Sequence, residues 1–277
     1  AGHRASGAAP PSRRPTRAGA PVPTEGVSEA GTEATESPFR SRPPIDDSDA
    51  AEVLRCGEVD VLGRMPWSSN ATLLVDVQYG DLLLQGVYKP GRGERPLHDF
   101  PPGLFRREAA AWELARQLGW GLIPPTVVRD GPLGEGSFQL YIPCDYDQHF
   151  FTLRDDPDHV AALQRLAAFD LVANSADRKG GHVLLGDDGG VWAVDNALCF
   201  HHQFKVRTVI WDWGGEPLAD ELLVDLGRLA DDGLSGSLAA LLDPFERDAV
   251  LTRAAALGED GVLPFDPTGR RIPWPLL

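Results

Sequence analysis

The chain has 277 residues, of which 42% are hydrophobic and 24% charged, and its formal net charge at pH 7 is −15. These values are typical of a globular protein with a substantial core. The excess of negative charge disfavours binding to nucleic acid or to anionic lipid headgroups. No apolar run approaches the roughly 18 to 20 residues that span a bilayer, so we expect no stable membrane insertion.

The cysteines indicate a cellular location. Cys56, Cys144 and Cys199 are far apart, and their odd number leaves at least one free thiol in any pairing scheme. Such usage favours a reducing compartment, and we expect a cytoplasmic protein.

Residues 1–45 differ in composition from the rest of the chain. They are rich in Ala, Pro, Ser, Gly, Thr and Arg and contain almost no large apolar side chains. Little burial is therefore available to offset the entropy of ordering the backbone. We expect a disordered tail, either a plain solvated extension or a segment that docks a protein partner, followed by a folded domain at residues 46–277.

The folded part begins with strand patterns. Residues 51–65 have the apolar spacing of a short helix followed by a strand, and residues 71–90 form a hairpin that ends near Lys89. The loop before the hairpin holds small polar residues whose backbone N–H groups can face an anion, although most such clusters are ordinary turns. These residues are Ser68, Ser69 and Asn70.

Residues 103–120 predict a helix that ends at Gly119. One carboxylate, Glu108, lies in the middle of its apolar stripe, where burial is costly unless a cation meets it. Lys89 at the end of the hairpin is a candidate partner; alternatively, Glu108 lies at the edge of the stripe and reaches water. The stripe consists of Leu104, Phe105, Ala111, Trp112, Ala115 and Leu118.

The rest of the chain is rich in helix patterns. Residues 125–144 predict two further strands around a Gly-rich turn, and residues 158–175, 218–232 and 242–258 have helical periodicity. A strand-rich half beside a helix-rich half indicates an α+β fold with two lobes.

Residues 171–200 carry the densest set of polar residues. The sequence GDDGG between two short apolar runs predicts a hairpin centred on Asp188. That register pairs His182 with Val194 and places His182 diagonally next to Asp195, so both heads can reach one point. Asp177, in the preceding loop, is expected at the same open end of the hairpin.

The residue types at this open end of the hairpin indicate phosphate chemistry. Asp177 and Asp195 offer hard oxygen ligands or a base. Gly180 and Gly181 are expected to let the loop turn sharply into the strand. Carboxylates collected beside a lysine are what a Mg-nucleotide site needs, because metal and lysine together neutralise phosphate charge.

The order of these motifs resembles the protein-kinase-like superfamily, and within it the phosphatidylinositol 3- and 4-kinase type. The shared features are a "YKP" lysine, a helical Glu, a "D-R" loop and a metal-binding Asp after a hairpin. The chain more closely resembles an actinobacterial family of uncharacterised proteins related to those kinases, from about Leu54 to the C-terminus. The resemblance implies an N-lobe at about 46–143 and a C-lobe at about 144–277.

The resemblance also implies roles for individual residues. Lys89 would bind the phosphates of ATP and pair with Glu108, Asp177 would act as catalytic base, and Asp195 would bind Mg or Mn. The loop of Ser68, Ser69 and Asn70 would cover the phosphates, and the backbone of residues 137–144 between the lobes would hold the adenine. Arg178 and Lys179 are either solvated loop charges or contacts to a phosphate, and their adjacency to Asp177 favours the contacts.

Two positions depart from the kinase pattern. His182 lies five positions after Asp177, where these kinases have a second metal-binding Asn, and Ala197 replaces the Gly of "D-x-G". Imidazole suits Mn or Zn better than Mg, so His182 is either a metal ligand or a hydrogen-bonded structural histidine. The departures leave open a single metal, a preference for Mn, or weak catalysis.

The sequence therefore predicts an ATP- and metal-dependent phosphotransferase acting on a hydroxyl acceptor. The acceptor is a lipid inositol headgroup, a protein or a metabolite. Two alternatives share the fold: a nucleotide-binding pseudokinase with a scaffold role, and an adenylyl transferase in which the nucleotide is flipped.

Overall fold

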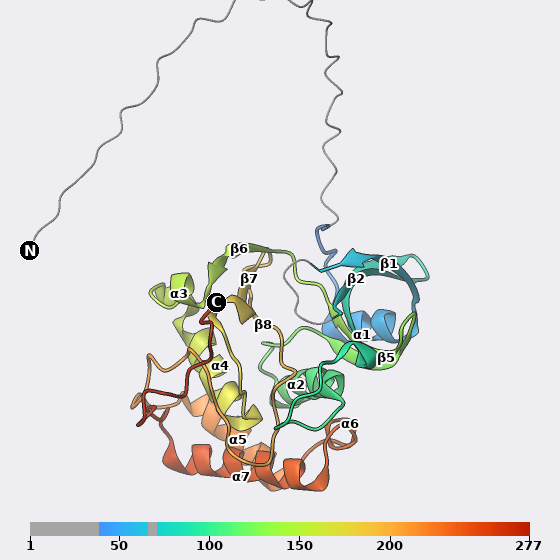
Figure 1. Cartoon of the computed structure of the whole chain (residues 1–277). Helices are drawn as coiled ribbons and strands as arrows, with labels where there is room; N and C mark the ends of the chain where they lie inside the picture. The colour runs from blue at the N-terminus through green and yellow to red at the C-terminus, as the bar shows by residue number, and fades with distance from the viewer. Residues whose placement is uncertain (1–38, 66–70) are drawn as a thin grey trace, which may run out of the picture. The chain divides into compact units, whose positions relative to one another are not determined.

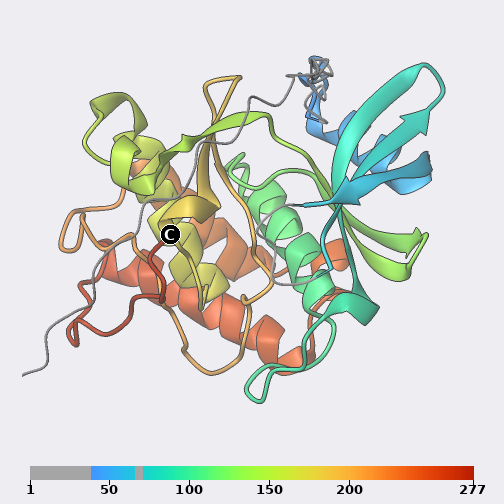
Figure 2. The same cartoon turned by 45° about the horizontal axis from the view of Figure 1, so that its top comes forward.

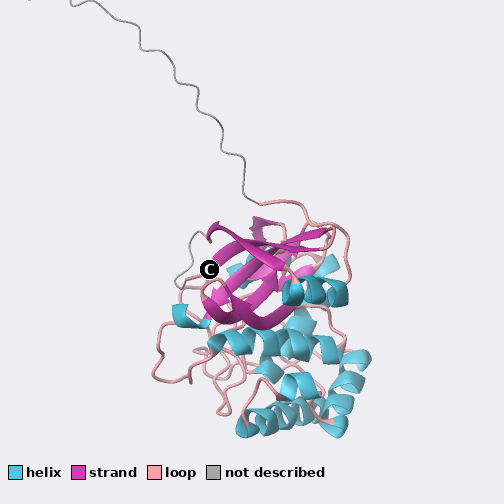
Figure 3. Cartoon of the chain, turned by 90° about the vertical axis from the view of Figure 1, so that its right-hand side faces the viewer, coloured by secondary structure: helices cyan, strands magenta, loops and turns pink. Residues whose placement is uncertain are grey.

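The computed structural model describes residues 39–65 and 71–277 of the chain (Figure 1). The predicted α+β fold is confirmed: an antiparallel sheet forms one part and helices dominate the other (Figure 3). The strands are β1 Glu58–Arg64, β2 Leu73–Tyr79, β3 Leu82–Pro90, β4 Thr126–Gly131, β5 Gly134–Leu140, β6 Cys144–His149, β7 Val183–Gly186 and β8 Val191–Ala193. The helices are α1 Asp47–Cys56, α2 Leu104–Leu118, α3 Phe150–Leu153, α4 Pro157–Ala173, α5 Asp220–Asp232, α6 Gly236–Ala239 and α7 Pro244–Asp260, with 3₁₀ turns at Gly91–Gly93 and Gly180–His182.

The larger sheet is antiparallel, with the strand order β1-β2-β3-β5-β4. Its central strand β3 pairs with β2 and β5, and Lys89 lies opposite Ser137 near the end of the strand. Because successive side chains of a strand point to opposite faces, Val87 and Lys89 share one face while Tyr88 points to the other. Tyr88 is fully buried there and stacks on Phe138.

Helix α2 lies between the sheet and the helices of the second part (Figure 2). Twelve of its fifteen residues are buried, so it is a core helix rather than a surface one. The carboxylate of Glu94 caps its start by accepting hydrogen bonds from the N–H groups of Gly103 and Phe105. Its end is set by Gly119, whose φ of 74° is the left-handed conformation that favours glycine.

The smaller sheet has the order β6-β7-β8 and contains the hairpin expected around Asp188. Val183 pairs with Ala193 and Leu184 with Trp192, and the N–H of Val194 donates to the carbonyl of His182. The predicted register is therefore confirmed. It carries His182 and the residues after β8 to the same end of the hairpin.

A buried ion pair ties α2 to the helical part. Arg107 donates to the carbonyl of Cys199 at 2.7 Å and to the carboxylate of Glu246 on α7. The side chains of Arg107 and Glu246 are 5% and 6% exposed, so neither charge has water as an alternative partner. Across residues 39–65 and 71–277, no helix combines the length and apolarity needed to cross a bilayer.

We predict that Arg107→Met lowers the free energy of unfolding by about 3 kcal/mol or more, because it removes the cation that pairs with the buried Glu246 carboxylate and leaves the N–H of Asp243 as its hydrogen-bond donor. Urea unfolding followed by circular dichroism measures the change. Arg106→Met is the matched control on the neighbouring position, since Arg106 pairs with Glu135 at the surface and both side chains are 48% exposed. That exposed pair should contribute less than about 1 kcal/mol. Equal losses in the two variants would contradict the prediction.

Candidate functional site

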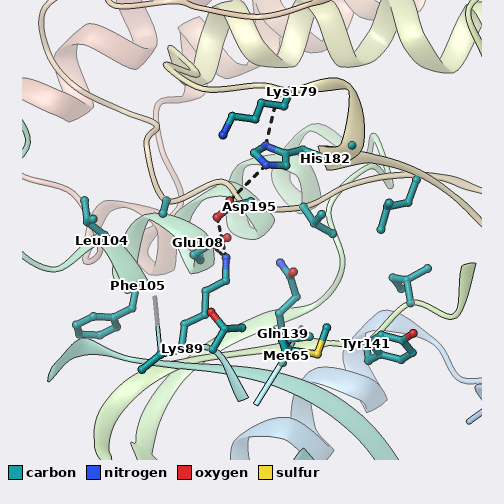
Figure 4. Close-up of a pocket in the computed structure, with 18 of the residues that line it drawn as sticks. Met65, Lys89, Leu104, Phe105, Glu108, Gln139, Tyr141, Lys179, His182 and Asp195 are labelled. Atoms are coloured by element: carbon teal, nitrogen blue, oxygen red, sulfur yellow. Dashed lines mark hydrogen bonds and ion pairs between the residues drawn. The ribbon is translucent and has the colours of Figure 1, made fainter. Parts of the chain in front are cut away.

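A cavity of about 560 Å³ lies between the larger sheet and the β7–β8 hairpin. One end is mainly apolar and is lined by side chains from β3, the end of β5, β7 and the segments that follow β1 and β5; these include Met65, Val87, Leu140, Ile142 and Leu184. The other end is charged. Its polar lining groups are Lys89, Glu108, Lys179, His182 and Asp195 (Figure 4).

The predicted contact between Lys89 and Glu108 is present. The Lys89 ammonium forms ion pairs with Glu108 and, at 2.9 Å, with the Oδ1 atom of Asp195 (Figure 4). Glu108 is 1% exposed, whereas half of the Asp195 side chain is exposed to the cavity. The alternative that Glu108 reaches water at the edge of the helix stripe is therefore wrong.

The backbone after β8 aims Asp195 into the cavity. Asp195 has a φ of 57°, a left-handed conformation that non-glycine residues adopt only when surrounding contacts hold it. The next residue supplies such a contact, because the N–H of Asn196 donates to Oε2 of Glu108 at 2.9 Å. Glu108 thus binds both the lysine and the backbone that carries Asp195.

The charges at this end of the cavity shift one another's protonation. The Lys89 ammonium lowers the pKa of Asp195 well below its ordinary value, although burial acts in the opposite direction. Burial disfavours the charge on Lys89, but Asp195 and Glu108 outweigh burial and raise the pKa of Lys89. The ammonium and the Asp195 carboxylate are therefore both charged at neutral pH.

His182 is neutral and lies beside Asp195. Its Nε2 atom is 3.5 Å from Oδ2 of Asp195, and the N–H of Lys179 points at its Nδ1 atom at 3.5 Å. Burial lowers the pKa of His182, with the attraction of Asp195 acting against it. Since Nδ1 faces a donor, the ring proton is on Nε2 and is directed at Asp195. A metal bound at Nε2 would need the opposite tautomer.

Asp177 lies beside the cavity rather than in its lining. Its carboxylate is 3.3 Å from the ammonium of Lys179, which does line the cavity. About 30% of the Asp177 side chain is exposed. The carboxylate is therefore available to a molecule that approaches the charged end from outside.

Arg178 does not reach the cavity, so the prediction that it contacts a phosphate is wrong. Its guanidinium is fully buried and pairs with Asp170 on α4. It also donates to the carbonyl of Val194 at 2.8 Å and to Oδ1 of Asn196 at 2.6 Å. Arg178 thereby holds the two residues that flank Asp195.

The loop does turn at the two glycines, in the 3₁₀ turn Gly180–His182 that leads into β7, but without a left-handed conformation. Neither Gly180 nor Gly181 has a positive φ. A Cβ at Gly180 would lie 2.6 Å from the ring of Phe151 and 3.0 Å from the side chain of Leu277. The glycine is therefore needed for close packing, which brings Leu277 and Pro275 to the wall of the cavity.

Some predicted site residues lie outside the described ones, and some residues that line the cavity were not predicted. Ser68, Ser69 and Asn70 lie outside the described residues, although Met65, Ala71 and Thr72 on either side line the cavity. Tyr141, Tyr146, Pro275 and Leu277 also line it. Tyr141 belongs to the predicted segment 137–144, whereas the other three belong to no motif and are identified only by their place in the fold.

The side chains of the charged end do not form a complete metal site by themselves. Within residues 39–65 and 71–277, no group of three or more His, Cys, Asp and Glu side chains could hold a metal ion. The Asp195 carboxylate is half exposed at this end, and Mg²⁺ is usually held by one or two carboxylates together with phosphate oxygens and water.

We predict that Gly180→Ala destabilises the protein by about 1–3 kcal/mol, because the added methyl group overlaps the Phe151 ring. Differential scanning fluorimetry and urea unfolding measure the loss. Gly181→Ala is the matched control, since the nearest atom to its added Cβ is 4.0 Å away. If the two substitutions cost the same, close packing at Gly180 is not the reason for the glycine.

Comparisons with known proteins place the chain among kinase-like folds. No model of a known protein family matches it. The Golgi casein kinase with Mn/ADP bound superposes with a TM-score of 0.55 at 15% identity, covering 81% of this chain and 77% of that one. Hydra Fam20 with sugar gives a TM-score of 0.51 at 14% identity, covering 78% of this chain and 87% of that one. At these identities the likeness shows the fold alone, and that fold is protein-kinase-like.

The sequence comparison identifies a family. Protein Rv2133c of Mycobacterium tuberculosis (strain ATCC 25618 / H37Rv) is 40% identical over 265 residues, which cover 82% of this chain and 95% of that protein. This chain therefore belongs to the same family as protein Rv2133c.

Proposed function

We propose that the protein is an ATP-dependent phosphotransferase whose nucleotide lies in the cavity between the larger sheet and the β7–β8 hairpin. One observation carries the proposal: the Lys89 ammonium lies between Glu108 and Asp195 at the charged end of a cavity whose other end is mainly apolar. An apolar slot suits a purine ring, and a lysine between two carboxylates suits a phosphate chain with its metal.

Each end of the cavity would bind a different part of the nucleotide. Val87 and Leu184 lie on opposite sides of the apolar end and would enclose the base. The backbone near Tyr141, between the two sheets, would bind the edge of the base. Lys89 would exchange its ion pair with Asp195 for the phosphates while Glu108 keeps the ammonium oriented.

The acceptor would approach from the side of Asp177. Its carboxylate would orient the acceptor hydroxyl and take up the hydroxyl proton, and Lys179, 3.3 Å away, would face the transferred phosphate. Electrostatic stabilisation and positioning supply most of the rate enhancement in phosphoryl transfer, so these roles need no covalent intermediate.

One divalent cation, Mg²⁺ or Mn²⁺, fits the donor set, and it would neutralise phosphate charge when bound. Asp195 would hold it, because its carboxylate is half exposed to the cavity. His182 would hold Asp195 in place through its Nε2–H rather than act as a direct ligand. The Golgi casein kinase, whose structure contains Mn and ADP, supports this combination of nucleotide and metal.

The acceptor would be a hydroxyl compound: a lipid inositol headgroup, a protein or a metabolite. A lipid inositol headgroup follows from the resemblance to phosphatidylinositol 3- and 4-kinases. A protein or a metabolite agrees equally well with a chain of net charge −15. A nucleotide-binding pseudokinase is the second candidate function, favoured by His182 at the position of the second metal-binding residue.

We predict that purified protein binds and turns over ATP with a divalent metal, and that Lys89→Met and Asp195→Asn each reduce turnover at least about 100-fold. Asp177→Asn should lose turnover but retain nucleotide affinity within about threefold, because it lies outside the cavity lining. Asp60→Asn, an exposed carboxylate on β1, is the control. Isothermal titration gives the affinity, and mass analysis of the product separates phosphoryl from adenylyl transfer. Metal-dependent binding without turnover would establish the pseudokinase instead.

We predict that one divalent ion per nucleotide is enough and that His182→Asn raises Mg-supported turnover relative to Mn-supported turnover. The substitution would place an amide oxygen, a hard ligand that suits Mg, where the Nε2–H of the wild-type imidazole binds no metal. Turnover measured across Mg and Mn concentrations at fixed ATP tests both parts. A wild-type enzyme that requires two ions would contradict the single-metal arrangement.

A further inference from the structure

Residues 39–45 lie alongside the segment that joins the two sheets, next to Leu140, Tyr141 and Pro143. Their side chains alternate with a period of three: Phe39, Arg42 and Ile45 are half-buried, and the residues between them are exposed. Three residues per turn is the repeat of a polyproline II helix, and Pro43 and Pro44 restrict the backbone to that region. One face of this segment, which we name the brace, therefore points at the protein.

The first end of the brace contacts the larger sheet and the connection between the sheets. Phe39 stacks on Tyr141 with ring centroids 5.2 Å apart and planes 15° apart. The N–H of Arg40 donates to Oε1 of Gln85 on β3 at 2.8 Å, and its guanidinium pairs with Asp76 on β2 at 2.9 Å.

The middle of the brace contacts the β7–β8 hairpin. The guanidinium of Arg42 is 2.5 Å from Oδ2 of Asp188 and lies over the ring of Trp192 at 5.6 Å. Asp188 also accepts hydrogen bonds from the N–H of Gly190 and from Nε1 of Trp192, so its position in the turn is fixed. Only 18% of the Arg42 side chain is exposed, which distinguishes this ion pair from the mobile pairs of the surface.

Three partners of the brace, Gln85, Tyr141 and Trp192, lie on segments that reach the cavity. Gln85 lies on β3, the strand that carries Lys89. Tyr141 lines the cavity itself, and Trp192 lies on β8, which is followed two residues later by Asp195. The brace therefore contacts both elements that carry the charged groups, β3 with Lys89 and the β7–β8 hairpin that precedes Asp195. The distance between those elements sets how far apart Lys89 and Asp195 can be.

We propose that residues 39–45 are positioning residues for the nucleotide site. By holding the larger sheet and the β7–β8 hairpin at a fixed separation, they keep Lys89, Tyr141 and Asp195 in one binding geometry. The two prolines reduce the entropy lost when the brace docks, because its unbound conformations are already restricted. This inference rests on the proposed nucleotide function for its effect on affinity, and on the contacts alone for its effect on backbone mobility.

The test uses the full chain with the double substitution Phe39→Ala, Arg42→Gln. Hydrogen exchange of the backbone at residues 139–142 and 186–190 is compared with wild type, together with the Kd for ATP in the presence of Mg²⁺. We expect exchange at both places to increase at least tenfold and Kd to rise about tenfold. The single variant Arg42→Lys, which retains the charge, should bind ATP with a Kd within threefold of the wild-type value. Arg55→Gln is the control, since Arg55 forms an exposed ion pair with Glu52 within α1.

The outcomes separate this inference from the proposed function. A wild-type protein that does not bind ATP contradicts the proposed function, and the exchange at residues 139–142 and 186–190 then decides the role of the brace. Unchanged exchange at those residues overturns the inference. So does a uniform rise in exchange over the whole chain, or an unchanged Kd in a protein that binds ATP, because either result means that the segment contributes only to general stability.

Discussion

The Lys89 ammonium is the group on which the site depends. It lies at the junction of three elements that are distant in sequence: strand β3, helix α2 and the turn after β8. Glu108 is 1% exposed, and a buried carboxylate stays charged only when a cation and hydrogen-bond donors compensate for the lost water. Lys89 and the N–H of Asn196 supply both. Without the lysine, Glu108 and Asp195 would be two like charges in one cavity.

Helix α2 fixes this junction because neighbouring residues on the helix point to different partners. Glu108 faces the cavity, whereas Arg107 reaches Glu246 and the carbonyl of Cys199 in the helical part. A movement of α2 that separated Glu108 from Lys89 would also leave the buried Arg107 and Glu246 unpaired. Breaking such a pair costs about 3–5 kcal/mol, so the charged end is assembled before any ligand binds.

The sequence was informative wherever a pattern constrained the backbone directly. The GDDGG turn determined the register of the β7–β8 hairpin, and this register correctly placed His182 beside Asp195. The stripe on α2 left two alternatives for Glu108, a buried charge that needs a cation or an edge residue that reaches water, and the structure shows the first. Local patterns of this kind have a period of two or 3.6 residues, and the fold has little freedom to override them.

The brace could not be predicted because its pattern has neither of those periods. A polyproline-like segment has no internal hydrogen bonds, and its contacts come from one side chain in three. Composition therefore groups residues 39–45 with the preceding tail, since only Phe39 and Ile45 are large and apolar. What orders them is a stack on Tyr141 and an ion pair with Asp188, and both partners are more than 100 positions away.

The error at Arg178 has a simple geometric cause. Arg178 pairs through its backbone with residues 207 and 209 in a parallel bridge, so the chain is extended there and adjacent side chains point in opposite directions. If Asp177 faces the outside of the cavity, Arg178 must face the interior, and both cannot contact one phosphate. Buried there, Arg178 binds Asp170, the carbonyl of Val194 and Asn196. The two residues of the Asp-Arg pair thus face opposite ways: Asp177 is partly exposed beside the cavity, where the proposed function would use it for an acceptor, and Arg178 holds the backbone that aims Asp195.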